Sequence, residues 1–194
     1  GAGRELAGLL EAAPHARIVA YDVSPAMVEA CRQRVSDLGT DRVTVACGAI
    51  ADVTTERPFD LVVGFNAVMS YPQPASERAR SFGASVQLLR PGGFAAFVVQ
   101  QRYGRPDWAV WFLLRKLATA LPRVRFDPTN HLSVLSGTGV EVHHFSAREL
   151  ASELRSAGYG EVECESLRAW SRRAGTRIPT RSPNPLVVIA RRPG

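Results

Sequence analysis

The 194 residues are 45% hydrophobic and 22% charged, which is typical of one folded globular domain and excludes disordered and collagen-like chains. The formal net charge of +6 comes almost wholly from arginine, because Lys116 is the only lysine. The sequence has no charged leader and no apolar run of ~18 residues, so we expect a cytoplasmic protein without a membrane span. The well-separated Cys31, Cys47 and Cys164 predict buried thiols and no metal site.

Helical and extended patterns alternate from one end of the chain to the other, which favours a parallel sheet covered by helices on both faces. Leucines at helical spacing predict a helix over residues 3–13, and a β-rich run follows and ends at Asp22. Ser24 is a good N-cap, and the helix that it begins is expected to stop at Gly39. The alternation continues with a strand at 43–46, a strand at 59–65, a helix at 74–90 and a strand at 94–99.

The second half opens with a less regular stretch, residues 100–144, which we interpret as a lid. Its aromatic residues Trp108, Trp111 and Phe112 indicate an amphipathic helix, and they either line an apolar pocket or simply cover the sheet. A capping box at Ser146–Glu149 then opens a helix that is expected to run to Gly158. Two extended runs, 161–170 and 186–190, complete the pattern as an antiparallel pair.

These elements predict an α/β fold with a doubly wound, mostly parallel sheet, helices on both faces and a C-terminal antiparallel strand pair. We expect one domain over residues 1–194. Its parts are a cofactor-binding half at 1–100, a lid or substrate insertion at 101–145, and the C-terminal helix and strand pair at 146–194.

A nucleotide site is indicated at the start of the chain. Gly1 and Gly3 directly precede a helix, where backbone N–H groups and the helix dipole favour a polar ligand. Asp22 follows about 20 residues later, at the end of the next strand, where a carboxylate can accept both ribose hydroxyls. Leu6 occupies the position of the third glycine of a dinucleotide fingerprint, which disfavours NAD. The alternatives are that the glycines only make a turn and that Asp22 only caps the following helix.

Four segments together carry a family resemblance: residues 1–3, 20–27, 59–63 and 88–94. In their order and spacing they resemble the class I (Rossmann-like) S-adenosylmethionine-dependent methyltransferases. The resemblance covers residues 1–100, with a weaker similarity at 145–159. It implies a Rossmann-like methyltransferase fold and S-adenosylmethionine (SAM) as the cofactor.

The resemblance also implies which residues hold the cofactor. Asp22 would bind the ribose diol, and Val23 and Met27 would flank the adenine. Ala49 stands where many members have an aspartate, so adenine recognition would rest on backbone and packing, and for Ile50 plain core packing is the alternative. The full set of implied cofactor residues is Gly1, Gly3, Asp22, Val23, Met27, Ala49, Ile50 and Phe65.

Members of the family have an apolar strand directly before the position of Gly1, in the middle of the sheet. Without a central strand, two rows of backbone groups lose their partners, at about 1–3 kcal/mol for each buried group, against a total stability of about 5–15 kcal/mol. We therefore expect the printed chain to be a fragment that lacks this strand.

The methyl acceptor is less well defined by the sequence. Candidates for a general base or a positioning group are His143, His144, Tyr71 and Asn66, with ordinary packing and turn roles as the alternative. Residues 65–71 lack the Asn/Asp-Pro-Pro-aromatic arrangement of members that methylate bases or amides. We therefore expect O- or N-methylation of a small molecule.

Other functions stay open. The chain is alternatively an RNA or protein methyltransferase that docks through its basic loop at 171–181. It is alternatively an NAD-dependent oxidoreductase or a non-catalytic nucleotide-binding module. The sequence does not indicate the oligomeric state.

Overall fold

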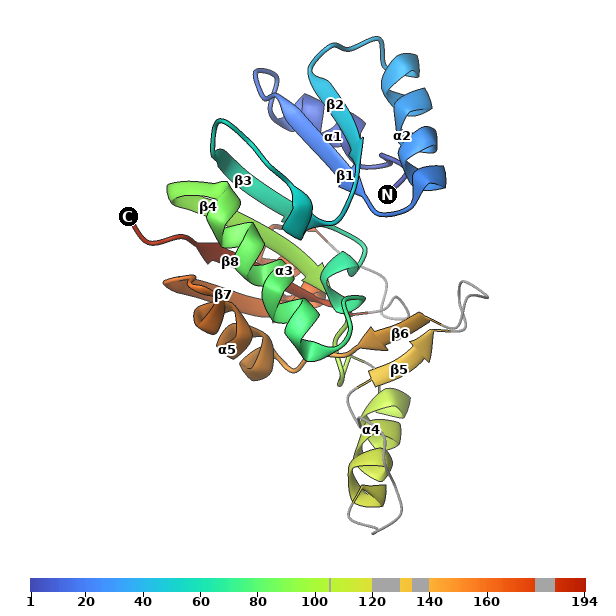
Figure 1. Cartoon of the computed structure of the whole chain (residues 1–194). Coiled ribbons are helices and arrows are strands. Elements are labelled where there is room, and N and C mark those ends of the chain that lie inside the picture. Colours follow the sequence, from blue (N-terminus) through green and yellow to red (C-terminus); the bar gives the residue numbers. More distant parts are fainter. Residues whose placement is uncertain (105, 120–129, 134–139, 177–183) are drawn as a thin grey trace. The chain divides into compact units, whose positions relative to one another are not determined.

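A computed structural model describes residues 1–104, 106–119, 130–133, 140–176 and 184–194 (Figure 1). The chain divides into two units, residues 1–54 and residues 55–194, and each is described by itself. Among the described residues, every helix is too short or too polar to cross a membrane. The expectation of a single methyltransferase domain over residues 1–194 stays a prediction.

The first unit is a pair of parallel strands with two helices. Its elements are α1 (Leu6–Ala12), β1 (Ile18–Asp22), α2 (Pro25–Asp37), β2 (Val43–Cys47) and the 3-10 turn η1 (Ile50–Asp52). The two strands pair in register, so that Asp22 lies opposite Cys47 at their carboxyl ends. Leu6, Leu10 and Cys31 are buried together with Val43 and form the small core of this unit.

The predicted boundaries of α2 are confirmed. The Ser24 hydroxyl accepts a hydrogen bond from the Met27 N–H at 3.4 Å, and Pro25 occupies the first helical position. Gly39 has a φ of 60° just beyond the helix, in the left-handed region that glycine adopts without strain.

The second unit contains a four-stranded sheet with the order β3-β4-β8-β7. The strands are β3 (Phe59–Gly64), β4 (Leu89–Val99), β7 (Glu161–Ser166) and β8 (Leu186–Arg191). β3 and β4 are parallel, whereas β8 is antiparallel to both of its neighbours. This arrangement confirms the predicted α/β fold class and the C-terminal antiparallel pair.

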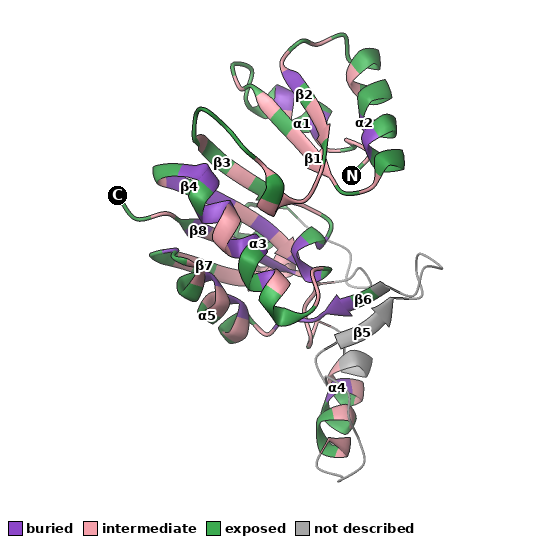
Figure 2. Cartoon of the chain, in the orientation of Figure 1, coloured by how far each residue is buried: buried purple, intermediate pink, exposed green. Residues whose placement is uncertain are grey.

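Helices and a short hairpin complete the second unit. They are η2 (Val68–Ser70), α3 (Ala75–Leu88), α4 (Pro106–Ala118), β5 (Asn130–Ser133), β6 (Val140–His143), α5 (Ala147–Ala157) and α6 (Leu167–Arg173). Phe82 of α3 lies at the centre of the core, with ring centroids 5.8 Å from Phe97 and 6.3 Å from Phe145. Leu150 and Leu154 of α5 are fully buried against the same cluster (Figure 2).

Several predicted boundaries are wrong. β4 begins at Leu89 instead of residue 94, because Leu89 pairs with Phe59 before a register shift brings Phe94 opposite Leu61. The extended run predicted at 161–170 ends at Ser166, whose hydroxyl accepts from the Ala169 N–H at 3.2 Å and caps α6.

The lid region and the cysteines also differ from expectation. The amphipathic helix is present as α4, but the β5–β6 hairpin was not predicted, and residues 120–129 and 134–139 lie outside the described residues.

Cys31 is buried as expected, Cys164 is partly buried and Cys47 is exposed.

Candidate functional site

In residues 1–54, polar groups converge at the carboxyl end of β1. The Asp22 carbonyl accepts a hydrogen bond from the Gly48 N–H at 3.0 Å, which joins the ends of the two strands. One Asp22 carboxylate oxygen accepts from the Ser24 N–H at 2.8 Å, and the other accepts from the Gly1 amino group. The structure therefore brings together three segments that the sequence analysis assigned to one site.

The Asp22 carboxylate is ionised at neutral pH. Burial raises its pKa, and the hydrogen bond from the Ser24 N–H acts in the opposite direction, because it stabilises the charged form. An ionised carboxylate only accepts hydrogen bonds, and its two oxygens have room for several donors. Asp22 is thus suited to a ligand with a pair of hydroxyl groups.

Gly3 is required by the backbone at the entry to α1. Its φ is +71°, and an added Cβ would lie 2.8 Å from Leu6 Cδ1 and 2.9 Å from Cys31 Sγ. The Gly3 carbonyl accepts from the Leu6 N–H at 3.2 Å, which starts the helix. Gly3 therefore forms a tight turn, which is one of the two roles that the sequence analysis considered for it.

Apolar side chains flank Asp22 on the surface of the same unit. Val23 is 69% exposed and Met27 is 42% exposed, although both are large apolar residues. Ala49 and Ile50 are partly buried where η1 begins, directly after Gly48. Exposed apolar surface beside an ionised diol acceptor matches the adenine and ribose of an adenosyl group, so the residues present fit SAM.

In residues 55–194, the chain turns sharply after β3. Asn66 and Ala67 have φ values of 52° and 62°, two successive left-handed residues that are not glycine. The left-handed conformation costs roughly 1–2 kcal/mol for most residues with a Cβ, and strain of this kind gathers at functional sites. The Ala67 N–H donates to the Val98 carbonyl at 3.0 Å, which holds the turn against β4. Tyr71 follows at the end of η2 with its side chain 43% exposed.

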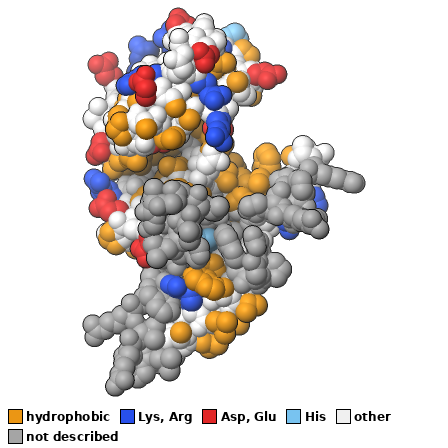
Figure 3. Space-filling view, turned by 90° about the vertical axis from the view of Figure 1, so that its right-hand side faces the viewer, with side chains coloured by type: hydrophobic (Ala, Val, Ile, Leu, Met, Phe, Trp, Pro, Cys, Tyr) orange, Lys and Arg blue, Asp and Glu red, His pale blue; other side chains and the backbone are white. Residues whose placement is uncertain are grey.

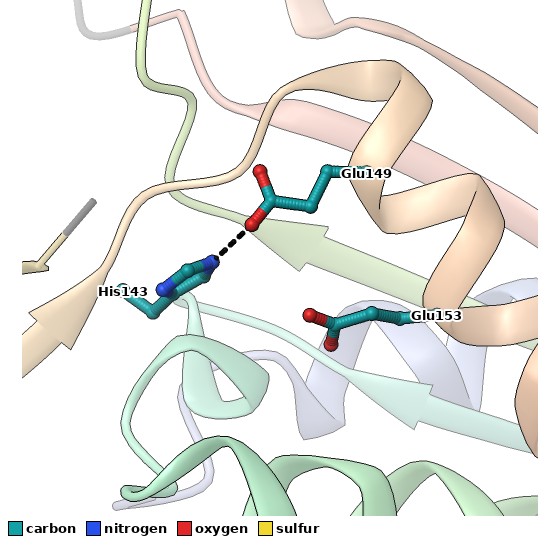
Figure 4. Close-up of side chains that lie close together, drawn as sticks. All are labelled: His143, Glu149 and Glu153. Atoms are coloured by element: carbon teal, nitrogen blue, oxygen red, sulfur yellow. Dashed lines mark hydrogen bonds and ion pairs between the residues drawn. The ribbon is translucent and has the colours of Figure 1, made fainter. Parts of the chain in front are cut away.

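The predicted histidines lie together at the end of β6, and both are buried. His143 Nε2 is 2.8 Å from a carboxylate oxygen of Glu149 (Figure 4). The His144 ring lies 5.0 Å from that of Phe112, which links it to α4. The Phe145 N–H donates to the Gln100 carbonyl at 2.9 Å, so the histidine segment is fixed to the carboxyl end of β4.

Two arginines and two glutamates surround this segment, and the sequence analysis did not assign any of them to the site. Arg102 pairs with Glu149 at 2.5 Å and also donates to the His144 carbonyl at 2.9 Å. Arg78, which is 3% exposed, pairs with Glu153 at 3.1 and 3.3 Å. The sequence contains part of the evidence for this cluster, because Glu149 and Glu153 are four residues apart and therefore lie on one face of α5.

One face of α4 is apolar and exposed. Phe112 is buried, which supports a covering role for it, whereas the side chain of Trp108 lies outside the described residues. Figure 3 shows hydrophobic side chains at this surface of the second unit. Those on α4 are more than half exposed: Val110, Leu113, Leu114 and Leu117.

Comparison with known sequences identifies the family. The family described as a methyltransferase domain matches residues 1–93. The carboxy-S-adenosyl-L-methionine synthase of Salmonella paratyphi C is 36% identical over 158 residues, which are 77% of this chain and 59% of the synthase. The match places residues 1–93 in the methyltransferase-domain family, and the chain spans about three fifths of the length of this relative.

Solved structures agree with the fold. A SAM-dependent methyltransferase from Methanosarcina mazei superposes with a TM-score of 0.72 at 16% identity, covering 100% of this chain and 89% of its own. The 1,6-didemethyltoxoflavin-N1-methyltransferase of Burkholderia thailandensis has a TM-score of 0.65 at 19% identity, over 100% of this chain and 68% of its own. These structures support the Rossmann-like fold.

Proposed function

We propose that this chain binds SAM and transfers its methyl group to an oxygen or nitrogen of a small molecule. The observation that carries the proposal is the ionised Asp22 at the carboxyl end of β1, beside Gly48, in a segment that matches the methyltransferase domain. In this proposal Gly1, Gly3 and Asp22 hold the ribose and methionine part. Val23, Met27, Ala49 and Ile50 enclose the adenine. The family resemblance also implies Phe65, which directly follows β3 in the second unit.

The cofactor supplies an electrophilic methyl group on a positively charged sulfur. The protein must align the methyl acceptor and exclude water, which together are worth up to about 7–11 kcal/mol of the barrier. A hydroxyl or ammonium acceptor must also lose a proton, and His143 and His144 are the candidates for taking it, because imidazole accepts protons near neutral pH. Asn66 and Tyr71, on the strained turn after β3, are candidates for holding the acceptor.

A small molecule is the preferred acceptor. Residues 65–71 lack the arrangement that holds a planar base or amide, and apolar side chains are available on α4. The Burkholderia neighbour is an N1-methyltransferase with bound 1,6-didemethyltoxoflavin and S-adenosylhomocysteine. Of the predicted basic loop, residues 171–173 form the end of α6, and residues 177–181 lie outside the described residues.

A second candidate reaction comes from the curated relatives. Their name gives carboxy-S-adenosyl-L-methionine as the product, and the identity of 36% over 158 residues extends beyond the cofactor-binding segments. Such a reaction would use the same adenosyl site, with a carboxylated form of SAM as its product.

The experiment has two steps. Thermal unfolding is recorded with SAM and with NAD, because a ligand that binds only the folded state raises the melting temperature in proportion to its binding free energy. The protein is then incubated with SAM and a panel of small phenols and amines, and the products are identified by mass spectrometry. We expect stabilisation by SAM and formation of S-adenosylhomocysteine together with a methylated product.

Other outcomes would point elsewhere. A carboxylated SAM product would support the second candidate, and stabilisation by NAD alone would contradict the proposal. RNA binding that weakens steeply with salt would favour an RNA substrate.

A further inference from the structure

The helix α4 is apolar on two sides, and only one of them is covered by its own unit. Phe112 is 3% exposed, and its ring lies 5.0 Å from that of His144. Away from Phe112, aliphatic residues recur at spacings of three and four residues, which places them on one face of the helix. They are 56–61% exposed, and we call them the α4 stripe: Val110, Leu113, Leu114 and Leu117.

A stripe of this kind indicates an interaction surface. A surface helix normally has one apolar face, which packs against its own protein, and polar residues on the opposite side. Single exposed leucines are common on folded proteins, but contiguous apolar patches mark sites where another molecule binds. The question is therefore which kind of molecule the α4 stripe fits.

Positive charge accompanies the α4 stripe. Arg115 and Lys116 lie in the last turn of α4, and residues 109–118 contain no acidic residue. Lys116 is exposed and comes three residues after Leu113, so it borders the stripe. In the sequence, residues 100–139 contain six arginine and lysine residues and two aspartates, which give this stretch a net charge of +4. The binding partner is therefore expected to be apolar and negatively charged at once.

A lipid surface fits this combination better than protein or RNA does. Two copies of the α4 stripe would bring four residues a side together, far below the roughly 20–30 of a standard protein interface, and both sides carry the same positive charge. RNA is bound by positive charge and stacked aromatic rings, to which aliphatic side chains add little. Anionic lipids offer acyl chains for the stripe and negative headgroups for the basic side chains.

We propose that α4 docks this protein on a membrane surface that contains anionic lipids. The α4 stripe enters the boundary between headgroups and acyl chains, while Lys116 keeps its ammonium group among the headgroup phosphates. The helix has 13 residues and is about 20 Å long, against about 30 Å for the hydrocarbon core of a bilayer, so it lies in the surface and does not cross it. This inference does not depend on the reaction that the protein catalyses.

Vesicle flotation tests the proposal directly. The protein is mixed with phosphatidylcholine vesicles that contain either no anionic lipid or about 30% phosphatidylglycerol. We expect binding to the anionic vesicles and at least about fivefold weaker binding to the neutral ones, because one Lys or Arg near an anionic surface already contributes that factor. Raising the salt concentration should weaken the binding to anionic vesicles, because salt screens the attraction.

A double variant, Leu113→Gln with Leu117→Gln, tests the apolar part. It should lower binding to the anionic vesicles by about 10–100-fold, because two leucines no longer enter the acyl region. Leu61→Gln is the matched control, since Leu61 is 51% exposed on β3, outside α4, and this variant should bind like the wild type. The replaced leucines are exposed and glutamine is a good helix former, so an unchanged melting temperature should show that the double variant is folded.

Lys116→Gln tests the charged part. It should weaken binding to the anionic vesicles by about fivefold and leave binding to neutral vesicles unchanged. Arg17→Gln removes the same charge from an exposed position in residues 1–54, and we expect it to bind like the wild type. An equal loss in the two variants would mean that only the net charge matters, which contradicts a docking surface on α4.

Other results would also overturn the proposal. Failure of the wild type to bind either kind of vesicle, or an equal loss in Leu61→Gln and in the double variant, would exclude docking through the α4 stripe. A dimer in light scattering that the double variant dissociates would show that a second copy covers the stripe. RNA binding that is weakened in Lys116→Gln and kept in the double variant, without vesicle binding, would assign the charge to RNA.

Discussion

Asp22 has an observed structural role and a proposed role in binding the cofactor. One carboxylate oxygen accepts from the Ser24 N–H and so helps to shape the turn between β1 and α2. The same hydrogen bond stabilises the charged form of the carboxyl group, which is the form that can accept hydrogen bonds from a ligand. The sequence analysis offered these two roles as alternatives, and the structure shows that the first does not exclude the second.

Asp22→Ala should weaken SAM binding by about 1.5–3 kcal/mol, the usual worth of a hydrogen bond to a charged group, which corresponds to roughly 10–150-fold in affinity. Titration calorimetry measures the change. Asp37→Ala is the control, because Asp37 is exposed on α2 and accepts only a local bond from Gln33. Equal affinity of Asp22→Ala and the wild type would remove Asp22 from the site.

Glu149 makes the stability of the protein depend on pH. Because its pKa is lowered in the folded state, its contribution is fully present above the unfolded-state value of about 4.3. The contribution is lost as the pH falls through the lower folded-state value. Urea unfolding should show Glu149→Gln less stable than the wild type by about 1–3 kcal/mol at pH 7, with the difference shrinking below pH ~4.

Glu163→Gln provides the comparison for this pH dependence. The Glu163 side chain is 78% exposed, so its ion pair with Arg173 is screened by water. We expect nearly equal stability of Glu163→Gln and the wild type at both pH values. A gap between Glu149→Gln and the wild type that stayed constant with pH would mean that the charge of Glu149 is not responsible.

At the scale of elements, local signals predicted helices better than strand boundaries. The ends of α2 and α5 depend on Ser24, on the Ser146–Glu149 box and on the following glycines, all of which are read within a few residues. The start of β4 at Leu89 depends instead on its pairing with Phe59, thirty residues earlier along the chain. Periodicity within one segment contains no information about such a pairing.

The entry to α1 provides a test at this scale. Gly3→Ala should lower the free energy of unfolding by about 1–2 kcal/mol through the left-handed backbone alone, with a further loss from the contacts with Leu6 and Cys31. Gly8→Ala, in open space within α1, should instead raise it by about 0.5–1 kcal/mol. Denaturant unfolding compares the two variants, and a stabilising Gly3→Ala would contradict the assigned turn.

At the scale of the whole molecule, the alternation of helices and strands was sufficient to predict the α/β class, and the family resemblance is confirmed. The cofactor residues could be proposed because the family resemblance implies them, and Asp22 also because it ends a strand, where position along the chain implies position in space. The network of Glu149, Arg102 and His143 could not, because it joins separate elements whose proximity results from packing.

Phe82 should be the most sensitive position of the large core. It is fully buried between the rings of Phe97 and Phe145, and Phe82→Ala should cost about 3–5 kcal/mol of stability. Phe94→Ala should cost about 1 kcal/mol or less, because this ring is 44% exposed. Calorimetry or urea unfolding measures both, and similar losses in the two variants would show that Phe82 is not central to the core.

The strand order also has a consequence for biosynthesis. β8 comes last in the chain among the four strands of its sheet, yet it lies between β4 and β7 and pairs with both. Until residues 186–191 have been made, β4 and β7 have no strand between them, and the backbone N–H and C=O groups along their facing edges lack the partners that β8 provides. The sheet of the second unit is therefore completed only when β8 has left the ribosome and pairs with both strands.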